Sequence, residues 1–376
     1  MGRTVGAAGQ RRIKALSAPG KVLSCSDGKR ATLIVMPSSA FHHDPTQDDP
    51  RTALTEALYE VKRVIVGQDA MLERLLVALL AGGHVLLEGV PGLAKTLTVN
   101  TLAQTLGGTF KRVQFTPDLV PSDLVGTRIF RPDTGRFDVE LGPVFGNFLL
   151  ADEINRAPAK VQSALLEVMQ ERQVTIAGMT YPLPAPFLVL ATQNPIESEG
   201  TYPLPEAQVD RFLMKIIVGY PTVGEEAAVV DRAITPPAPV QQRVEATDLV
   251  GYRAQAREVY VDRAVVAYAV SLADATRHPE RYGMEDLREH IAFGASPRGP
   301  IGMVQAAQAL ALLRGRRHVV PDDVRHLAPD VLRHRIALSY DALAEGVTAQ
   351  DIVERVLEAV DAPQRASVLH DSAEAA

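Results

Sequence analysis

The apolar positions of the chain first repeat with a helical spacing at residue 54. Leu54, Leu58, Val61 and Ile65 lie three or four residues apart, which places them on one face of a helix. The same spacing continues over residues 71–80, until a Gly-Gly pair stops it. Two helices are therefore expected ahead of the first strand.

Short continuous apolar runs at residues 85–87, 148–151 and 187–191 are typical of strands buried on both faces. A helical pattern follows the first run, and a helical stripe separates the second from the third. This alternation predicts an α/β fold with a parallel sheet between two layers of helices, a three-layer αβα arrangement. After Pro221 only helical patterns follow, and they predict a small all-helical domain with helices near residues 224–234, 248–258, 261–276, 300–314 and 322–336.

Composition agrees with two packed domains and a tail. The chain has 376 residues, of which 46% are hydrophobic and 22% charged. Residues 1–50 mix Gly, Ser, Asp and basic side chains, so they are expected to form a disordered tail. The α/β core is then predicted at 51–221, the helical domain at 222–345, and a C-terminal helix and tail at 346–376.

Charge and cysteine usage exclude several kinds of site. Cys25 is the single cysteine, so no internal disulfide and no multi-cysteine metal site is expected. No apolar stretch approaches the roughly 18 residues that cross a bilayer, and no signal-peptide pattern is present, so we expect no membrane insertion and a cytoplasmic location. The net charge of -6 predicts no nucleic-acid partner, although a local basic strip around Arg314 leaves that open.

A glycine-containing loop lies between the first strand and the helix after it. It comprises Gly89, Val90, Pro91, Gly92, Leu93, Ala94, Lys95 and Thr96. Backbone N–H groups in such a loop bind the phosphates of ATP, with Lys95 at the β- and γ-phosphates and the Thr96 hydroxyl on Mg²⁺. Ala94 stands where the general motif has glycine, so for this loop alone an ordinary strand-to-helix turn remains an alternative.

Two adjacent carboxylates end the second apolar run. Asp152 would hold the magnesium ion through its water shell, and Glu153, pointing the other way along the pleat, would polarise the attacking water. The alternative is an acidic pair at the start of a helix, where carboxylates favour the helix dipole. Because a phosphate loop precedes the pair, ATP hydrolysis is the better account, and both interpretations are compatible.

The third run ends in a polar amide. Asn194 would lie between the acidic strand and the phosphate loop, where it could orient the attacking water or contact the γ-phosphate. The alternative is a strand-end turn residue in front of a proline.

Together these segments resemble the P-loop AAA+ superfamily and, within it, the MoxR family, over roughly residues 52–345. The loop at 89–96 is similar to the family's phosphate loop even at Ala94. The matching segments are Walker B at 150–157, sensor 1 at 191–195, the arginine-finger segment at 204–212 and sensor 2 at 295–298. The resemblance implies an AAA+ nucleotide-binding domain followed by a helical lid.

Further site residues are implied by the resemblance only. Arg211 would reach the γ-phosphate of a neighbouring subunit, and Arg298 would contact nucleotide when domains or subunits close. The backbone of Val66 and Gly67 would meet the adenine. The alternative for Arg211 and Arg298 is that they are solvated or paired with nearby carboxylates. The alternative for Val66 and Gly67 is a turn between two helices.

The resemblance also accounts for two insertions. Residues 118–142 match the family's helix-2 insert, and residues 173–186 match its hairpin before sensor 1, both expected to project into the pore of a ring. Surface loops are the alternative, and the turn residues of both segments support it equally.

The resemblance thus predicts an ATPase that forms a hexameric ring and acts as a chaperone-like remodeller or maturation factor for protein clients. A partner with a von Willebrand factor A domain would be a separate protein. Alternatives are a magnesium-chelatase-type motor subunit and a nucleotide-dependent binding switch. A nucleic-acid motor is disfavoured by the charge of -6.

Overall fold

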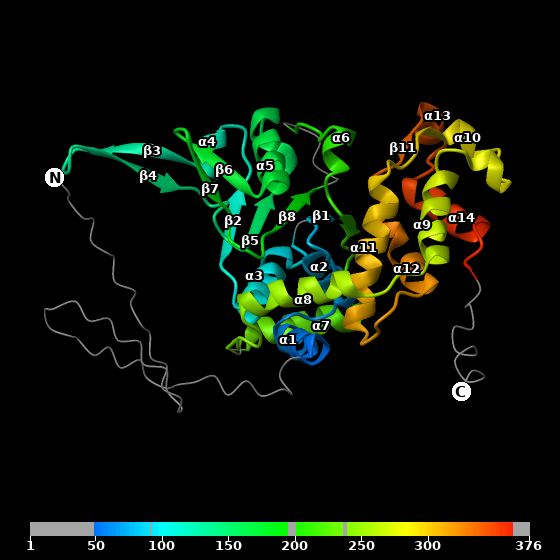
Figure 1. Cartoon of the computed structure of the whole chain (residues 1–376), viewed down its shortest axis with the longest axis horizontal. Helices are drawn as coiled ribbons and strands as arrows, with labels where there is room; N and C mark the ends of the chain where they lie inside the picture. Colours follow the sequence, from blue (N-terminus) through cyan, green and yellow to red (C-terminus); the bar gives the residue numbers. More distant parts are fainter. Residues whose placement is uncertain (1–48, 91, 195–200, 236–238, 364–376) are drawn as a thin grey trace, which may run out of the picture. The chain divides into compact units, whose positions relative to one another are not determined.

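The computed structural model describes residues 49–90, 92–194, 201–235 and 239–363 (Figure 1). Most of the tail predicted at 1–50, including Cys25, lies outside the described residues, as do Pro91 and the chain after residue 363. None of the helices in the described part of the chain combines the length and the apolar character that crossing a bilayer requires.

The centre of the α/β domain is a five-stranded parallel sheet with the order β2-β5-β8-β1-β9. Its strands are β1 (Val85–Glu88), β2 (Phe110–Gln114), β5 (Phe148–Asp152), β8 (Leu188–Gln193) and β9 (Met214–Ile217). The three central strands are the apolar runs that the sequence predicts. The two edge strands were not predicted, because polar side chains interrupt their apolar pattern.

Helices cover both faces of this sheet. Alternate strand residues pack into two different buried clusters, as the two-residue repeat of a strand requires. One cluster contains side chains of α1 (Pro50–Val64), α2 (Asp69–Ala81) and α3 (Lys95–Thr105), and the other those of α5 (Ala159–Glu171). The predicted three-layer αβα arrangement is therefore confirmed (Figure 1).

Two antiparallel hairpins occupy the segments predicted as insertions. The first consists of β3 (Gly126–Arg131) and β4 (Arg136–Leu141), preceded by α4 (Pro121–Val125). The second consists of β6 (Gln173–Ile176) and β7 (Met179–Pro182). Figure 1 shows the β3–β4 hairpin reaching away from the parallel sheet.

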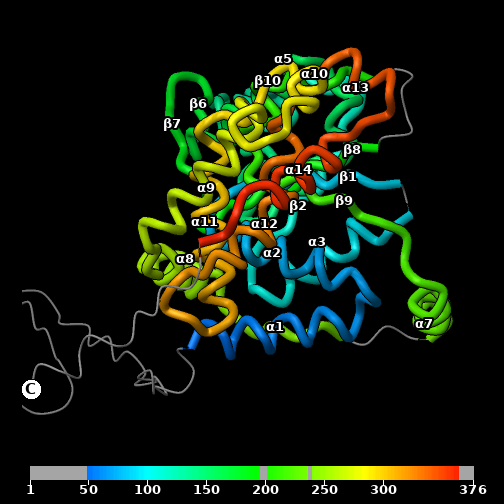
Figure 2. Tube along the Cα trace, turned by 90° about the vertical axis from the view of Figure 1, so that its right-hand side faces the viewer, coloured from blue at the N-terminus to red at the C-terminus, as the bar shows by residue number. Residues whose placement is uncertain are grey.

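The remaining chain is mainly helical, as predicted. Its longer helices are α7 (Val223–Ile234), α8 (Ala246–Glu258), α9 (Arg263–Ala275), α11 (Arg298–Leu313), α12 (Pro321–Leu332) and α14 (Ala349–Ala359). Its shorter helical elements are α10 (Leu287–His290), α13 (Tyr340–Glu345) and the 3-10 turn η2 (Pro279–Tyr282), whereas α6 (Glu206–Val209) and the 3-10 turn η1 (Ile154–Arg156) belong to the α/β core. Figure 2 shows α7 at the margin of the structure, away from α9 and α12.

A short pair of strands follows Pro221, where only helices were expected. β10 (Ile291–Phe293) and β11 (Ala337–Leu338) form a short antiparallel pair within the helical domain. Strands of two and three residues are too short to produce a recognisable alternation in sequence.

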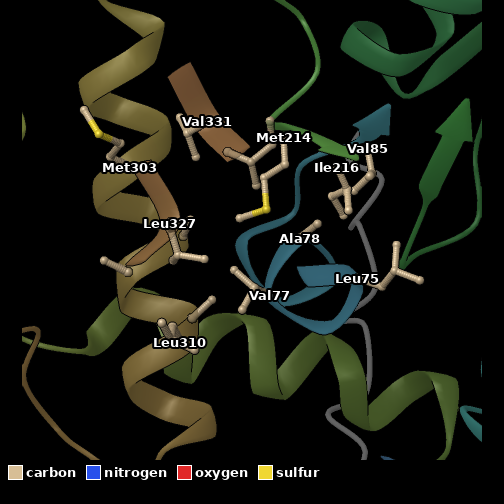
Figure 3. Packing of buried hydrophobic residues seen from close by; sticks show 14 of the residues in the cluster. Leu75, Val77, Ala78, Val85, Met214, Ile216, Met303, Leu310, Leu327 and Val331 are labelled. Carbon is tan, nitrogen blue, oxygen red and sulfur yellow. The ribbon is translucent and has the colours of Figure 1, made fainter. Parts of the chain in front are cut away.

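The helical domain packs against α2 and β9 of the core. Figure 3 shows Val77 and Ala78 of α2 among Met303 of α11 and Leu327 and Val331 of α12. All five side chains are at least 99% buried and belong to one continuous cluster. This apolar contact joins the α/β core to the helical domain.

Candidate nucleotide site

The order of the strands brings the predicted site residues to one edge of the sheet. β8 lies between β1 and β5, and because all three run parallel their carboxyl ends meet there. A cleft of about 440 Å³ opens at this edge. Its lining includes Gly89, Gly92, Leu93, Ala94, Lys95, Thr96, Arg112, Asp152, Glu153, Thr192 and Asn194.

The phosphate loop has the backbone geometry of an anion cradle. Gly92 and Ala94 have positive φ angles of 88° and 54°, and α3 begins directly afterwards at Lys95. The first N–H groups of a helix have no acceptor within it, so those of α3 face the cleft as donors. At Gly89 a Cβ would lie 2.5 Å from the carbonyl oxygen of Val218, so this position accepts only glycine. Val90 follows Gly89 in the described part of the loop.

Lys95 lies within the cleft, where its Nζ donates a hydrogen bond to the carbonyl oxygen of Gly89. Partial burial lowers the pKa of Lys95, and the carboxylates of Asp152, Glu88 and Glu153 oppose that shift. The Lys95 ammonium group is therefore partly shielded from water and faces the carboxylates. Phosphate oxygens bound in the cleft would interact strongly with a positive charge in this position.

Both carboxylate oxygens of Asp152 have partners. Oδ1 accepts a hydrogen bond from the Thr192 hydroxyl at 2.6 Å, and Oδ2 accepts from Nη2 of Arg112 at 2.6 Å. The Thr192 hydroxyl also accepts from the backbone N–H of Glu153 at 2.8 Å. Arg112 and Thr192 were missed in the sequence analysis, since their roles depend on which strands become neighbours.

Glu153 is placed differently from the expectation. β5 ends at Asp152, and Glu153 has a left-handed φ of 58°, so the expectation that it follows the pleat is wrong. Its Oε2 accepts from Nε2 of Gln114 at 2.6 Å and pairs with Nε of Arg156 at 3.1 Å. The turn η1 begins after it, but within the described residues its side chain makes no capping hydrogen bond. The carboxylate instead faces the cleft.

Gln114 is a second site residue that the sequence analysis missed. It is the register partner of Asp152 on the neighbouring strand. Because side chains two residues apart in a strand point to the same face, Gln114 shares a face of β2 with Arg112. Nη2 of Arg112 donates to Oε1 of Gln114 at 3.0 Å, which leaves the amide group directed at Glu153. Gln114 thus orients the carboxylate that would polarise water.

Replacing Gln114 with leucine is expected to lower kcat for ATP roughly tenfold with little change in KM, since a Glu153 carboxylate that keeps its pair with Arg156 but loses the Gln114 hydrogen bond is less often in position. Steady-state phosphate release over a range of ATP concentrations measures both constants. Gln104→Leu on α3 is a suitable control, because among the described residues its side-chain amide bonds only to Asn100 of the same helix. Faster turnover in the Gln114 variant would instead mean that Gln114 keeps Glu153 away from water.

The remaining residues of the predicted site fall into two groups. Asn194 is 8% exposed and lines the cleft at the end of β8. Val66 and Gly67 lie outside this cleft, beside a second cavity of about 370 Å³ lined in part by Gln68 and Gly219. Nε2 of Gln68 donates to the carbonyl oxygen of Gly219 at 3.4 Å, one residue beyond the Val218 carbonyl that faces Gly89.

Arg211 and Arg298 are not among the described residues that line the cleft. Nη1 of Arg298 donates to Oδ2 of Asp210 at 3.3 Å, so the two predicted arginines lie close to one another in the fold. Nη1 of Arg211 donates to the carbonyl oxygen of Leu166 at 3.4 Å. Its Nε is buried and has no hydrogen-bond partner among the described residues.

Comparison with known proteins agrees with this fold and cleft. The family of ATPases associated with various cellular activities (AAA) matches residues 84–214, and the AAA lid domain matches residues 285–356. The parallel sheet, the phosphate loop and the helical domain therefore define an AAA+ protein.

Two relatives and one solved structure narrow the class. The chain is 58% identical over 311 residues to Chaperone MoxR1 of Mycobacterium tuberculosis, covering 83% of this chain and 82% of that protein. It is 34% identical over 339 residues to Protein MoxR of Methylorubrum extorquens, covering 85% and 98%. A crystal structure from Cytophaga hutchinsonii, described as a candidate ATPase, is 51% identical with a TM-score of 0.80, covering 84% and 96%. The chain belongs to the MoxR family of AAA+ ATPases.

The lid match also bears on the extent of the helical domain. It runs past residue 345, and α14 packs against α9 and α12. We infer that the lid extends through α14 to Ala359, beyond the boundary expected from the sequence.

Proposed function

We propose that this protein binds ATP with Mg²⁺ in the cleft and hydrolyses the γ-phosphate bond. The observation that carries the proposal is the meeting of Lys95, Asp152, Glu153 and Asn194, from three neighbouring strand ends, in one cleft. Lys95 and the loop N–H groups would bind the phosphates, Glu153 would accept a proton from the attacking water, and Asn194 would orient that water.

The donor set fits magnesium bound together with phosphate. The described residues hold no group of three or more His, Cys, Asp and Glu side chains able to bind a metal by themselves. Mg²⁺ prefers oxygen ligands and is commonly held by one carboxylate with substrate phosphates, a pattern that Thr96 and Asp152 in the cleft match. When bound, Mg²⁺ would neutralise charge on the phosphate oxygens.

The second cavity is our proposed adenine site. It is lined by Gln68 and Gly219, and the backbone of Gly67 lies directly before Gln68. Backbone groups of Val66 and Gly67 at its margin could contact the base edge, as the family resemblance implies. The Val218–Gly219 segment lies between this cavity and the phosphate loop.

We further propose that the active form is a ring, with six subunits as the expected number, in which Arg211 and Arg298 complete a neighbour's site. The supporting observation is that both arginines lie beside Asp210 and outside the described lining of their own cleft. A heterologous interface that closes into a ring would place that surface on the next subunit's cleft.

Two inactive variants test this arrangement. Lys95→Ala, the finger donor, should fail to bind ATP but present an intact Arg211, whereas Arg211→Ala, the ATP acceptor, should bind ATP without a neighbour's arginine. Mixing them forms some complete sites, so ATP turnover should partly return and rise steeply with total protein concentration. If mixed oligomers form by gel filtration and stay inactive, Arg211 does not act across an interface.

The proposed output of turnover is chaperone-like remodelling of protein clients, assisted by a separate von Willebrand factor A-domain partner. A relative sharing 58% identity is named a chaperone, which favours this output over a chelatase-type motor. Phe130 and Phe137, directly opposite on the β3–β4 hairpin, are 50% and 56% exposed and offer clients an apolar contact. A pure binding switch would show no assembly-stimulated phosphate release.

A further inference from the structure

Asp210 joins the segment that carries Arg211 to the helical lid. Its carboxylate accepts hydrogen bonds from the Ser296 hydroxyl at 3.0 Å, from Nη1 of Arg298 at 3.3 Å and from Nε of Arg335 at 2.9 Å. All three donors belong to the helical domain, whereas Asp210 follows α6 of the core. The Asp210 carboxylate of the core therefore accepts hydrogen bonds from three side chains of the lid, directly beside Arg211 in the sequence.

Arg335 makes the most extensive of these contacts. Besides Asp210, it donates from Nη2 to the carbonyl oxygen of Phe212 at 2.6 Å and from Nη1 to that of Leu213 at 3.1 Å. Nη1 also bonds the carbonyl oxygen of Val331 in the lid. The side chain is 3% exposed, and burial lowers the pKa of Arg335 to about 10, so it stays charged at neutral pH.

These bonds hold the backbone on both sides of Arg211. Arg335 contacts residue 210 through side chain and carbonyl, and residues 212 and 213 through their carbonyls. Phe212 is fully buried, which fixes the chain from the core side. Among the described residues, the Arg211 guanidinium makes only the 3.4 Å hydrogen bond to the carbonyl oxygen of Leu166. Its direction therefore depends on its backbone.

We propose that Arg335 and Asp210 form a clamp through which the lid of one subunit positions Arg211 for ATP hydrolysis in the next subunit. The inference rests on the proposed action of Arg211 across an interface. Arg335 and Asp210 would be positioning residues: neither is among the described residues that line the cleft, and they would act through the orientation of Arg211. A tilt of the lid would move the finger with it, so lid position in one subunit would control turnover in its neighbour.

The plain alternative is that the clamp only ties the lid to the core. Glu73 on α2 provides a matched case, because it is also a core carboxylate paired with lid side chains, Nε2 of His326 at 3.0 Å and Nη2 of Arg314 at 3.5 Å. It is remote from Arg211 in sequence and contacts neither Asp210 nor Arg335 through any described bond. A merely structural clamp should, like Glu73, show no loss of turnover that is confined to the finger donor.

The test places each substitution in one chosen partner of the mixing experiment. Asp210→Asn added to the finger donor should lower the restored turnover roughly 10- to 100-fold, since small displacements of a catalytic group cost about that much. Added to the ATP acceptor, whose own Arg211 is already absent, it should leave the restored turnover within about twofold. ATP affinity of the acceptor should not change.

Asp210→Asn also weakens the contact between Asp210 and Arg298, whereas Arg335→Lys leaves both of those residues in place. The second variant therefore tests the clamp separately from the Arg298 contact. Lysine keeps the charge but cannot reach the Asp210 carboxylate and the carbonyls of Phe212 and Leu213 together. It should therefore reproduce the loss in the donor only, whereas Glu73→Gln should have no effect in either partner. Thermal midpoints and gel filtration of each mixture verify folding and assembly.

The outcomes distinguish the two levels of the proposal. If the parent mixture recovers turnover, and neither Asp210→Asn nor Arg335→Lys in the donor lowers that turnover, the clamp is overturned and the ring arrangement remains intact. Equal losses in donor and acceptor also overturn it, because that is the pattern of a structural tie. Absence of rescue in the parent mixture overturns the ring arrangement itself.

Discussion

Arg211→Ala is expected to reduce ATP turnover by about 10³–10⁵-fold, equivalent to about 4–7 kcal/mol of barrier. An arginine that arrives from a neighbour stabilises the charge that develops in the transition state of phosphoryl transfer, so it acts mainly on the rate of the chemical step. The chain's own cleft, whose described lining lacks Arg211, should bind ATP normally. The variant should therefore lose kcat while its affinity for a fluorescent ATP analogue stays the same.

A surface arginine serves as the control for this change. Arg288 is 71% exposed and pairs weakly with Glu280 at 3.5 Å, so Arg288→Ala should turn over ATP at the parent rate. A loss of ATP affinity in Arg211→Ala, matching its loss of turnover, would place Arg211 at the ground-state nucleotide. An unchanged rate would remove it from the reaction.

Glu153→Gln is expected to lower hydrolysis by roughly 10²–10⁴-fold, as for loss of a general base, while ATP still binds. Glutamine keeps the shape of the side chain and can still meet Gln114, but it cannot take a proton from water. Asp152 remains held by Thr192 and Arg112, so the candidate metal ligand is undisturbed. Single-turnover hydrolysis and equilibrium ATP binding measure the two effects separately.

The corresponding control is Glu167→Gln on the exposed side of α5, which should leave turnover unchanged. Normal hydrolysis in Glu153→Gln would restrict Glu153 to a structural role after β5. A variant that retains ATP should also retain clients, so a pull-down with Glu153→Gln identifies them, and the same pull-down with Lys95→Ala, which should not bind ATP, is the reference.

Most of the core architecture was predictable from local patterns. β1, β5 and β8 are central strands covered by helices on both faces, and such strands must be apolar along their whole length. The edge strands β2 and β9 escaped prediction for the same physical reason. β2 is largely exposed and contains Lys111 and Arg112, and Lys215 interrupts β9.

The sequence by itself also determined that the residues predicted at the strand ends meet in the cleft. Lys95, Asp152 and Asn194 each follow a predicted strand, and parallel strands deliver such residues to one edge whatever the detailed register. The backbone of Glu153 was not predictable in this way. Its left-handed φ of 58° turns the chain out of the pleat of β5, and no pattern of apolar and polar residues in the sequence predicts that turn.

Only the tertiary structure decided which partners hold these groups. Gln114 meets Glu153 because β2 pairs with β5 in one register, and a shift of one residue would direct its side chain to the opposite face. Arg335 meets Asp210 across 125 residues, through the packing of the lid on the core. Such contacts follow from the relative placement of whole elements, which the periodicity within each element does not encode.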